Sequence, residues 1–558
     1  MEKSVAETAS PVPNDRPHPM SEAVASQEPE NTQSDIHNPA NLDLVDDRDV
    51  QYETGIRLAT IISSVTLTAF LITLDGSIIA TAIPKITSQF HFLFRKLGDC
   101  LQSTSSALQP VTGKLYAHFS LKYTYITFLA LFEFGSLICG VATSSNMLII
   151  GRAIAGMGSS GVGNGALTIL SASIPLEKRA LYFSITASVG QMGVVLGPLI
   201  GGALTEYTTW RWCFYINLPI GGLAIASLVW VAVPNTSSEG PKQMNFTSLF
   251  HELDITGCLL FSPTMVMFLL AIEWGGSTYP WNSAVIIGLF CGAAGNLALF
   301  LIWEHKKGES AMIPFQMVKK RAVYSAGLCV FFLYANNLMT SYYLSIYFQG
   351  VRGKTPTLSG VYMLPGIISL MVSGITAGLT VTRVGYYLPL AVIGTVLTAV
   401  GSGLISTFTQ YTKTGTWIGY QIIGGLGRGL SMQMPLVAVQ NNLPASQIAV
   451  SMAFLSFSQN FGGSLFLSFA ETAFGIGLGN ALPRYAPGVP VDKISSIGVS
   501  GIRSMLPQSD VEGVIMAYAI AVQQVFYIVA ATATVAFIFS WGLGWKSVKK
   551  ARNTSPEA

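Results

Sequence analysis

The sequence predicts an all-α membrane protein whose helices cross the bilayer many times. Half of the 558 residues are hydrophobic and 11% are charged, against roughly 25% charged residues in a soluble domain. The mean hydropathy is +0.50. Apolar stretches of about 20 residues, each long enough to cross a bilayer, recur along most of the chain. These observations exclude a string of soluble domains.

Several function classes are not expected from this sequence. The net charge is +3 and scattered, which does not indicate a nucleic-acid partner. The six cysteines show no spacing typical of a zinc site or a disulfide framework. No G-x-x-x-x-G-K-[ST] loop is present, so ATP-driven pumping is not expected. We predict a protein that is not an enzyme and that needs no metal or cofactor.

The apolar stretches divide the chain into fourteen predicted spans with polar segments around them. In order, we predict a disordered cytosolic tail (1–54), a six-span half (55–233), a polar linker (234–253), two inserted spans (254–303), a basic loop (304–322), a second six-span half (323–545) and a cytosolic tail (546–558). The segment 474–513 is predicted to be a long external loop.

The distribution of lysine and arginine predicts the orientation. With a cytosolic N-terminus, most basic loop residues fall on the cytosolic side, including Lys306, Lys307 and the run 319–321. This bias follows the positive-inside rule. We therefore expect both termini in the cytosol.

A face of glycines organises the predicted fifth span. Gly193, Gly197 and Gly201 are spaced four residues apart and share one side of a helix, with Pro198 inside the same apolar run. A helix with these residues is tolerable in a bilayer, where neighbouring helices can satisfy the backbone at a kink. A glycine face also lets another helix approach closely. Taken alone, this pattern is compatible with a packing helix of any membrane protein.

The full string is more specific. Gly193-x-x-x-Gly197-Pro198-x-x-Gly201-Gly202 resembles the antiporter motif in the fifth span of major facilitator drug exporters, and residues 210–221 resemble the start of their sixth span. The resemblance covers roughly residues 55 to 545. It implies the major facilitator fold, with two six-helix halves related as parallel repeats and alternating access driven by proton entry. The fourteen-span drug:proton antiporters, and their fungal toxin and multidrug branch, are the most similar group.

Three intramembrane charges are candidates for proton coupling. Asp75 is the only charge in the first span, and residues 74–84 resemble a first-span motif in which an Asp stands at this place. Arg152 lies in a Gly151–Gly158 string that resembles the fourth-span motif, whose Arg is assigned to proton coupling. Glu133, in the third span, is the reserve proton site. The alternatives are a helix-packing role for Asp75 and an interfacial, outward-reaching side chain for Arg152.

The second span is degenerate. Residues 91–106 are polar and rich in serine, so a helix from 97 to 119 is long enough but poorly hydrophobic. The family shows an apolar run at this place, and the length here is similar. The stretch therefore looks substituted rather than deleted, as a misread reading frame or splice site would produce.

The second half carries candidate substrate-binding residues. Arg428 interrupts the glycine-rich string 424–429, and Gln421 lies in the same span; Asn336, Asn337 and Tyr342 lie in the span 323–348. Amide and aromatic linings suit amphipathic organic molecules. Arg428 is open to two interpretations: a side chain facing a wet cavity, or recognition of an anionic or polar substrate.

We therefore expect a monomeric, proton-coupled exporter of a small organic compound such as a secondary metabolite, toxin or drug. The expected location is the plasma membrane, with the vacuolar membrane as the alternative. An importer of a siderophore, basic amino acid or other nutrient with the same fold is one competing function. A transport-defective copy is another, and only the degenerate second span favours it.

Overall fold

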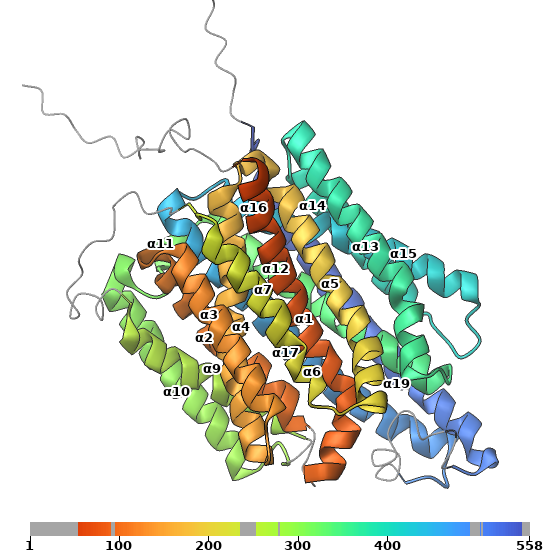
Figure 1. Cartoon of the computed structure of the whole chain (residues 1–558). Coiled ribbons are helices and arrows are strands. Elements are labelled where there is room, and N and C mark those ends of the chain that lie inside the picture. Colours follow the sequence, from red (N-terminus) through yellow and green to blue (C-terminus); the bar gives the residue numbers. More distant parts are fainter. Residues whose placement is uncertain are drawn as a thin grey trace, which may run out of the picture. The chain divides into compact units, whose positions relative to one another are not determined.

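The computed structural model describes residues 54–90, 95–234, 253–276, 279–490, 503 and 506–549. Over these ranges the chain forms long helices and no β-strand, only two isolated bridges (Figure 1). The expectations for residues 1–53, for the linker from 235 to 252 and for residues 550–558 lie outside the described residues. Within the described ranges, the all-α architecture is confirmed.

The helices follow the predicted spans in order. The first group is α1 (Gly55–Phe90), α2 (Arg95–His118), α3 (Leu121–Gly140), α4 (Ser145–Ser173), α5 (Leu176–Tyr207), α6 (Trp212–Tyr215) and α7 (Asn217–Trp230). Next come α9 (Ile255–Trp274), α10 (Ala284–Lys307) and the short α11 (Phe315–Val318). The last group is α12 (Arg321–Ile346), α13 (Pro356–Val384), α14 (Leu388–Ile405), α15 (Thr414–Ser431), α16 (Met434–Gln440), α17 (Ala445–Tyr485) and α19 (Gln508–Ser540).

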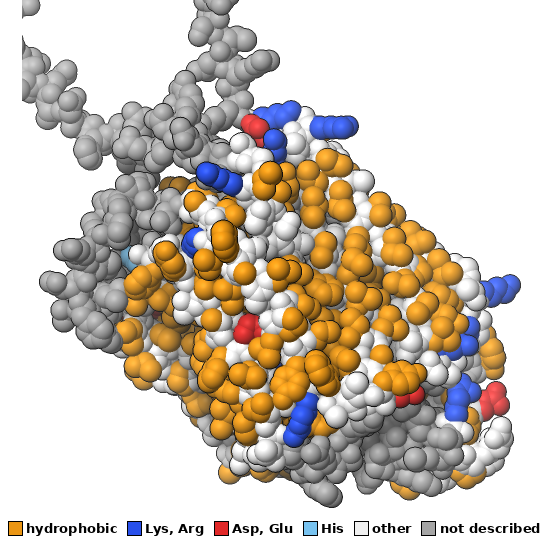
Figure 2. Space-filling view, viewed as in Figure 1, with side chains coloured by type: hydrophobic (Ala, Val, Ile, Leu, Met, Phe, Trp, Pro, Cys, Tyr) orange, Lys and Arg blue, Asp and Glu red, His pale blue; other side chains and the backbone are white. Residues whose placement is uncertain are grey.

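Twelve of the helical segments in the described ranges are long and apolar enough to cross a membrane. Helices α2 and α4, the predicted second and fourth spans, are 24 and 29 residues long but are not among these twelve, because they are less apolar. On the face drawn in Figure 2, hydrophobic side chains cover a broad area, and lysine and arginine lie mostly towards its ends. This distribution is expected of a surface in contact with lipid.

Neighbouring helices satisfy the polar side chains of α2. Thr112 accepts a hydrogen bond from Asn164 of α4 (3.1 Å), and Gln109 accepts one from Asn460 of α17 (2.8 Å). The Tyr116 hydroxyl donates to the carbonyl of Gly161 (3.0 Å). A polar helix is stable in a bilayer when it is covered by other helices in this way. Residues 91–94 and the side chains up to residue 103 lie outside the described part, so the expectation for 91–106 stays a prediction.

One of the expected boundaries is wrong. The predicted loop 474–513 is helical at both ends, because α17 continues to Tyr485 and α19 begins at Gln508. The Phe474 ring packs against Tyr343 and Tyr518, which extends the apolar core beyond the expected span. Helices α15 and α16 are separated by a short turn, and together they form one candidate membrane span, Thr414–Gln440.

Candidate functional site

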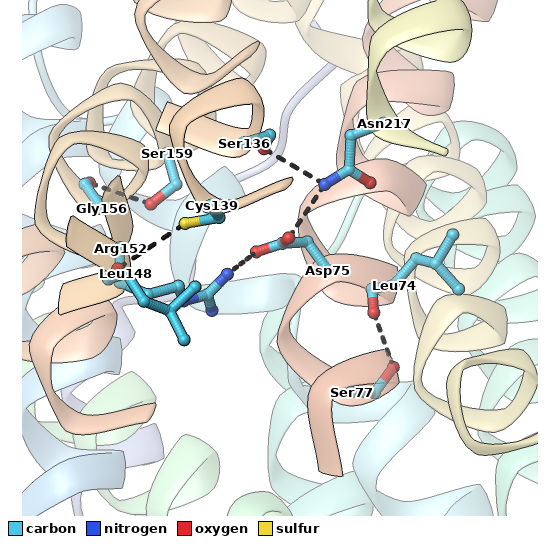
Figure 3. Close-up of polar contacts among 10 residues, drawn as sticks. All are labelled: Leu74, Asp75, Ser77, Ser136, Cys139, Leu148, Arg152, Gly156, Ser159 and Asn217. Atoms are coloured by element: carbon cyan, nitrogen blue, oxygen red, sulfur yellow. Dashed lines mark hydrogen bonds and ion pairs between the residues drawn. The ribbon is translucent and has the colours of Figure 1, made fainter. Parts of the chain in front are cut away.

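A buried ion pair joins α1 and α4 in the first half. One amino group of the Arg152 guanidinium donates to Asp75 Oδ2 at 2.7 Å (Figure 3). Asp75 has no exposed surface and Arg152 is 2% exposed. The structure therefore places two of the three predicted coupling residues in direct contact.

A side chain from a third helix completes the shell around Asp75. Asn217, in the first turn of α7, donates to Asp75 Oδ1 at 2.9 Å, and the same amide nitrogen lies 3.2 Å from the hydroxyl of Ser136 on α3 (Figure 3). Sequence reasoning did not select Asn217 or Ser136. A signal was available, because Asn217 is an amide within the apolar string 210–221 that carries the family resemblance.

The pair is held tightly because both carboxylate oxygens of Asp75 have partners. Two charges removed from water are stable only when their mutual attraction and their hydrogen bonds offset the lost hydration. Removing one partner of such a pair costs about 3–5 kcal/mol, since the other charge is left buried and alone. Arg152 also lies over the ring of Phe214 (5.9 Å to its centroid), and its Nε has no hydrogen-bond partner among the described residues.

Glu133 lies beside this cluster without a partner of its own. It is buried, and neither carboxyl oxygen forms a hydrogen bond within the described part of the chain. It stands one turn from Ser136 on α3, and the absence of a side chain at Gly221 of α7 makes the space for it. An ionised carboxylate at this place would have no hydrogen-bond donor among the described residues to replace its hydration.

The glycine face of α5 packs against α1 on both sides of Asp75, with Gly193 against residues before it and Gly197 against residues after it. A Cβ at Gly193 would lie 2.7 Å from the backbone nitrogen of Leu74, and one at Gly197 would collide with the Ser77 side chain and lie 2.9 Å from the Ile78 nitrogen. The Ser77 hydroxyl donates to the carbonyl of Gly193 (2.8 Å). Helix α5 continues through Pro198, and Gly201 is buried. Gly202 faces open space.

The candidates in the second half differ in burial and in their hydrogen-bond partners. Asn336 is buried and donates to the Ser402 hydroxyl (3.0 Å) and to the carbonyl of Val529 (2.8 Å). Gln421 is also buried and donates to the Tyr362 carbonyl (3.0 Å). Of the remaining three candidates, Asn337 is half-buried, Tyr342 is exposed and Arg428 is buried.

The comparisons with known proteins agree with this architecture. The family model of the Major Facilitator Superfamily matches residues 65–467, which is more than half of the chain. The chain belongs to the major facilitator superfamily. It is a multi-pass membrane protein that transports small molecules, because its similar relatives are named as transporters and efflux pumps.

Two relatives and one solved structure illustrate the similarity of this superfamily member. The MFS-type transporter pigP of Monascus ruber is 48% identical over 89% of this chain and 87% of its own. The efflux pump mlcE of Penicillium citrinum is 45% identical over 90% of this chain and 93% of its own. The crystal structure of the human organic anion transporter MFSD10 (TETRAN) aligns with a TM-score of 0.55 at 12% identity, covering 87% of this chain and 99% of that one. That likeness shows the fold alone.

Proposed function

We propose that this transporter is a proton-coupled exporter of small organic compounds, such as secondary metabolites, toxins or drugs, and that it works by alternating access. The observation that carries the proposal is the buried Asp75–Arg152 pair, which ties α1 to α4 and, through Asn217, to α7. A titratable group held by a switchable partner is what proton coupling requires, and intramembrane ionisable residues mark proton relays. The names of the similar efflux pumps support export over nutrient import.

Proton coupling follows from the chemistry of the pair. When a proton binds Asp75, the carboxylate that neutralises Arg152 is lost, and a lone buried guanidinium favours a rearrangement that hydrates it. Return of Arg152 to Asp75 expels the proton. Because the pair joins separate helices, each protonation step changes their packing and can be coupled to the opening of one side or the other.

We further propose fourteen spans, in which α2 and α4 cross the membrane together with the twelve apolar segments. In this proposal α9 and α10 are an inserted pair between the halves 55–233 and 323–545. Support comes from the packing of α9, whose Phe261 ring lies 5.2 Å from Phe457 of α17 and whose Ser262 donates to the Ala107 carbonyl of α2. The inserted pair thus bridges a helix from each half.

Contacts between the two halves at the cytosolic ends of their helices fit an outward-facing state, because they hold the cytosolic side closed. Near the start of α5, Arg179 donates to Gln440 of α16 (3.1 Å), and the carbonyl of Glu177 accepts from Thr382 of α13 (2.9 Å). With both termini in the cytosol, these residues lie at the cytosolic ends of their helices. We propose the plasma membrane as the location, the vacuolar membrane as the alternative, and a monomer as the working unit.

The topology has a direct test. We expect tags at both termini to be protected from external protease in intact cells. A tag at Gly488 should be cleaved, because Gly488 is exposed after α17. The measurement is proteolysis of tagged cells before and after permeabilisation. A C-terminal tag that is cleaved in intact cells would mean an odd number of spans.

Glu133 is proposed as a second proton-binding site. We expect Glu133→Gln to reduce gradient-driven export about 100-fold, a typical contribution of one proton-transfer group, while substrate exchange without a gradient continues. Because neither carboxyl oxygen of Glu133 forms a hydrogen bond among the described residues, glutamine loses no such contact, and the variant should be as stable as the wild type. Vesicle efflux with and without a pH gradient separates the two rates. Equal loss of both would instead assign Glu133 a structural role.

The proposed function is tested most directly in membrane vesicles. Inside-out vesicles acidified in the lumen should accumulate a transported compound, and collapse of the gradient by a protonophore should stop the accumulation. An importer driven by proton symport would release the compound from such vesicles instead of accumulating it. A transport-defective copy would move no member of a panel of toxic compounds, and a strain lacking the gene would tolerate those compounds as well as the wild type.

A further inference from the structure

The second half repeats the packing of α3 against α4. Gly158 of α4 lies against the backbone of Phe132 of α3, and Gly427 of α15 lies against the backbone of Thr398 of α14. In each case a Cβ on the glycine would collide with the partner residue. The two contacts therefore align α4 with α15 and α3 with α14.

The packing of α1 against α5 is repeated in the same way. Gly193 of α5 approaches the carbonyl of Phe70 on α1, and Gly462 of α17 approaches the carbonyl of Phe331 on α12. This contact aligns α1 with α12. It agrees with two halves that are related as parallel repeats.

These alignments pair the ion pair of the first half with two amides in the second. Asp75 is five residues after Phe70, as Asn336 is after Phe331. Arg152 is six residues before Gly158, as Gln421 is before Gly427. Asn336 and Gln421 are therefore a neutral copy of the Asp75–Arg152 pair, and no ion pair forms in that copy.

Among the described residues of the second half, one charged side chain is nevertheless buried, that of Arg428. It lies seven residues after Gln421, at the position that Ser159 occupies after Arg152. The Ser159 hydroxyl is satisfied within its own helix by the carbonyl of Gly156 (2.9 Å). Arg428 is 6% exposed, its Nε has no hydrogen-bond partner, and no described carboxylate pairs with it.

The other buried arginines have partners, which makes Arg428 unusual. Arg152 pairs with Asp75, and Arg179 donates to the Ile174 carbonyl and to Gln440. A buried cation without a partner is costly, because burial removes its hydration and nothing replaces it. Such a cation is stabilised by any anion that reaches it.

Two amide oxygens of the second half, one on the helix of Arg428 and one on α12, are acceptors without a donor among the described residues. Gln421 Oε1 and Asn336 Oδ1 are both buried without a hydrogen-bond donor among the described residues. Gln421 and Arg428 are seven residues apart on α15, so they share a face of the helix and are separated by about 10 Å along it. A molecule of drug size spans that distance and can offer both an anion and a hydroxyl donor.

We propose that Arg428 receives the anionic group of the transported compound, so that the substrates are organic anions, with carboxylates as the best match to a guanidinium. The inference names the substrate class of the exporter proposed above and rests on that proposal for the direction of transport. Binding itself does not depend on the direction. In the first half, the charges of Asp75 and Arg152 neutralise each other. In the second half, the equivalent residues are neutral amides, so the charge of Arg428 is available to bind the substrate.

The test compares three probes of similar size and different charge on the purified, full-length transporter in lipid nanodiscs. We expect naphthoate to bind at least about 10-fold more tightly than naphthylmethanol or naphthylmethylammonium. A charge-assisted hydrogen bond between its carboxylate and Arg428 would provide a difference of this size. Arg428→Gln should weaken naphthoate binding roughly 10- to 100-fold and leave the alcohol unchanged. Arg428→Lys should retain part of the preference, because it keeps the charge without the planar fork.

Two controls keep the result interpretable. Arg484→Gln removes an exposed arginine at the end of α17 and should leave naphthoate binding unchanged. Without ligand, Arg428→Gln should unfold at the same or a higher temperature than the wild type, because it removes an uncompensated buried charge. Equal affinity of the wild type for all three probes, or an anion preference that survives Arg428→Gln, would overturn the inference. Loss of proton-driven efflux with normal naphthoate preference would count against the proposed export function alone.

Discussion

Asp75→Asn is expected to reduce pH-gradient-driven export to background while substrate binding remains. Asparagine keeps the size of the side chain and still accepts a hydrogen bond from Arg152 or Asn217, but it cannot take up and release a proton. Because Arg152 would then be a buried charge without a counter-charge, we also expect a loss of stability of about 3–5 kcal/mol. The measurements are efflux from loaded vesicles under an imposed pH gradient and thermal unfolding in detergent.

A double variant separates coupling from stability. Asp75→Asn with Arg152→Gln places in the first half the two amides, Asn and Gln, that stand at the equivalent positions Asn336 and Gln421 of the second half. We expect this double variant to regain most of the stability, since no charge is left unpaired, and to stay uncoupled. Arg152→Ala should also impair coupling, and Arg152→Lys should impair it less. If the stable double variant still accumulates substrate against its gradient at the wild-type rate, Asp75 is not the coupling residue.

Gly197→Leu is expected to abolish export although the chain still inserts into the membrane. A leucine at this position meets the Ser77 side chain and the backbone of α1, so α1 and α5 must separate. Overpacking of this kind typically destabilises a protein by about 1–3 kcal/mol. We expect a cost of this size to alter the packing of α1 and α5 without unfolding either helix. The displaced segment of α1 directly follows Asp75. Export rate and abundance in the membrane are the two measurements.

Gly202→Leu is the matched control, on the same helix and with the same added side chain. Gly202 has no atom within 4 Å of an added Cβ, so we expect wild-type export and abundance. Unchanged export by Gly197→Leu would mean that close contact between α1 and α5 is not needed for transport. Equal loss of export in both variants would point to a general effect of leucine on α5.

The sequence by itself determined that the chain is all-α with many apolar segments long enough to cross a membrane, and which helix carries a closely packed glycine face. A membrane span needs about 20 apolar residues, and a glycine face needs only glycines spaced four residues apart. Both are local properties of the chain. The positions of Asp75, Glu133, Arg152 and Arg428 inside apolar runs were equally visible, since any charge within such a run is unusual.

Only the tertiary structure decided what those charges do to one another. Asp75 and Arg152 are 77 residues apart, and Asn217 is 142 residues from Asp75, so no local pattern relates them. Hydropathy alone also cannot show that the polar side chains of α2 have partners on neighbouring helices, as Thr112 has in Asn164 of α4. The same reason separates Arg152 from Arg428: both are arginines in glycine-rich helices, and only the packing of the other helices gives one of them a counter-charge.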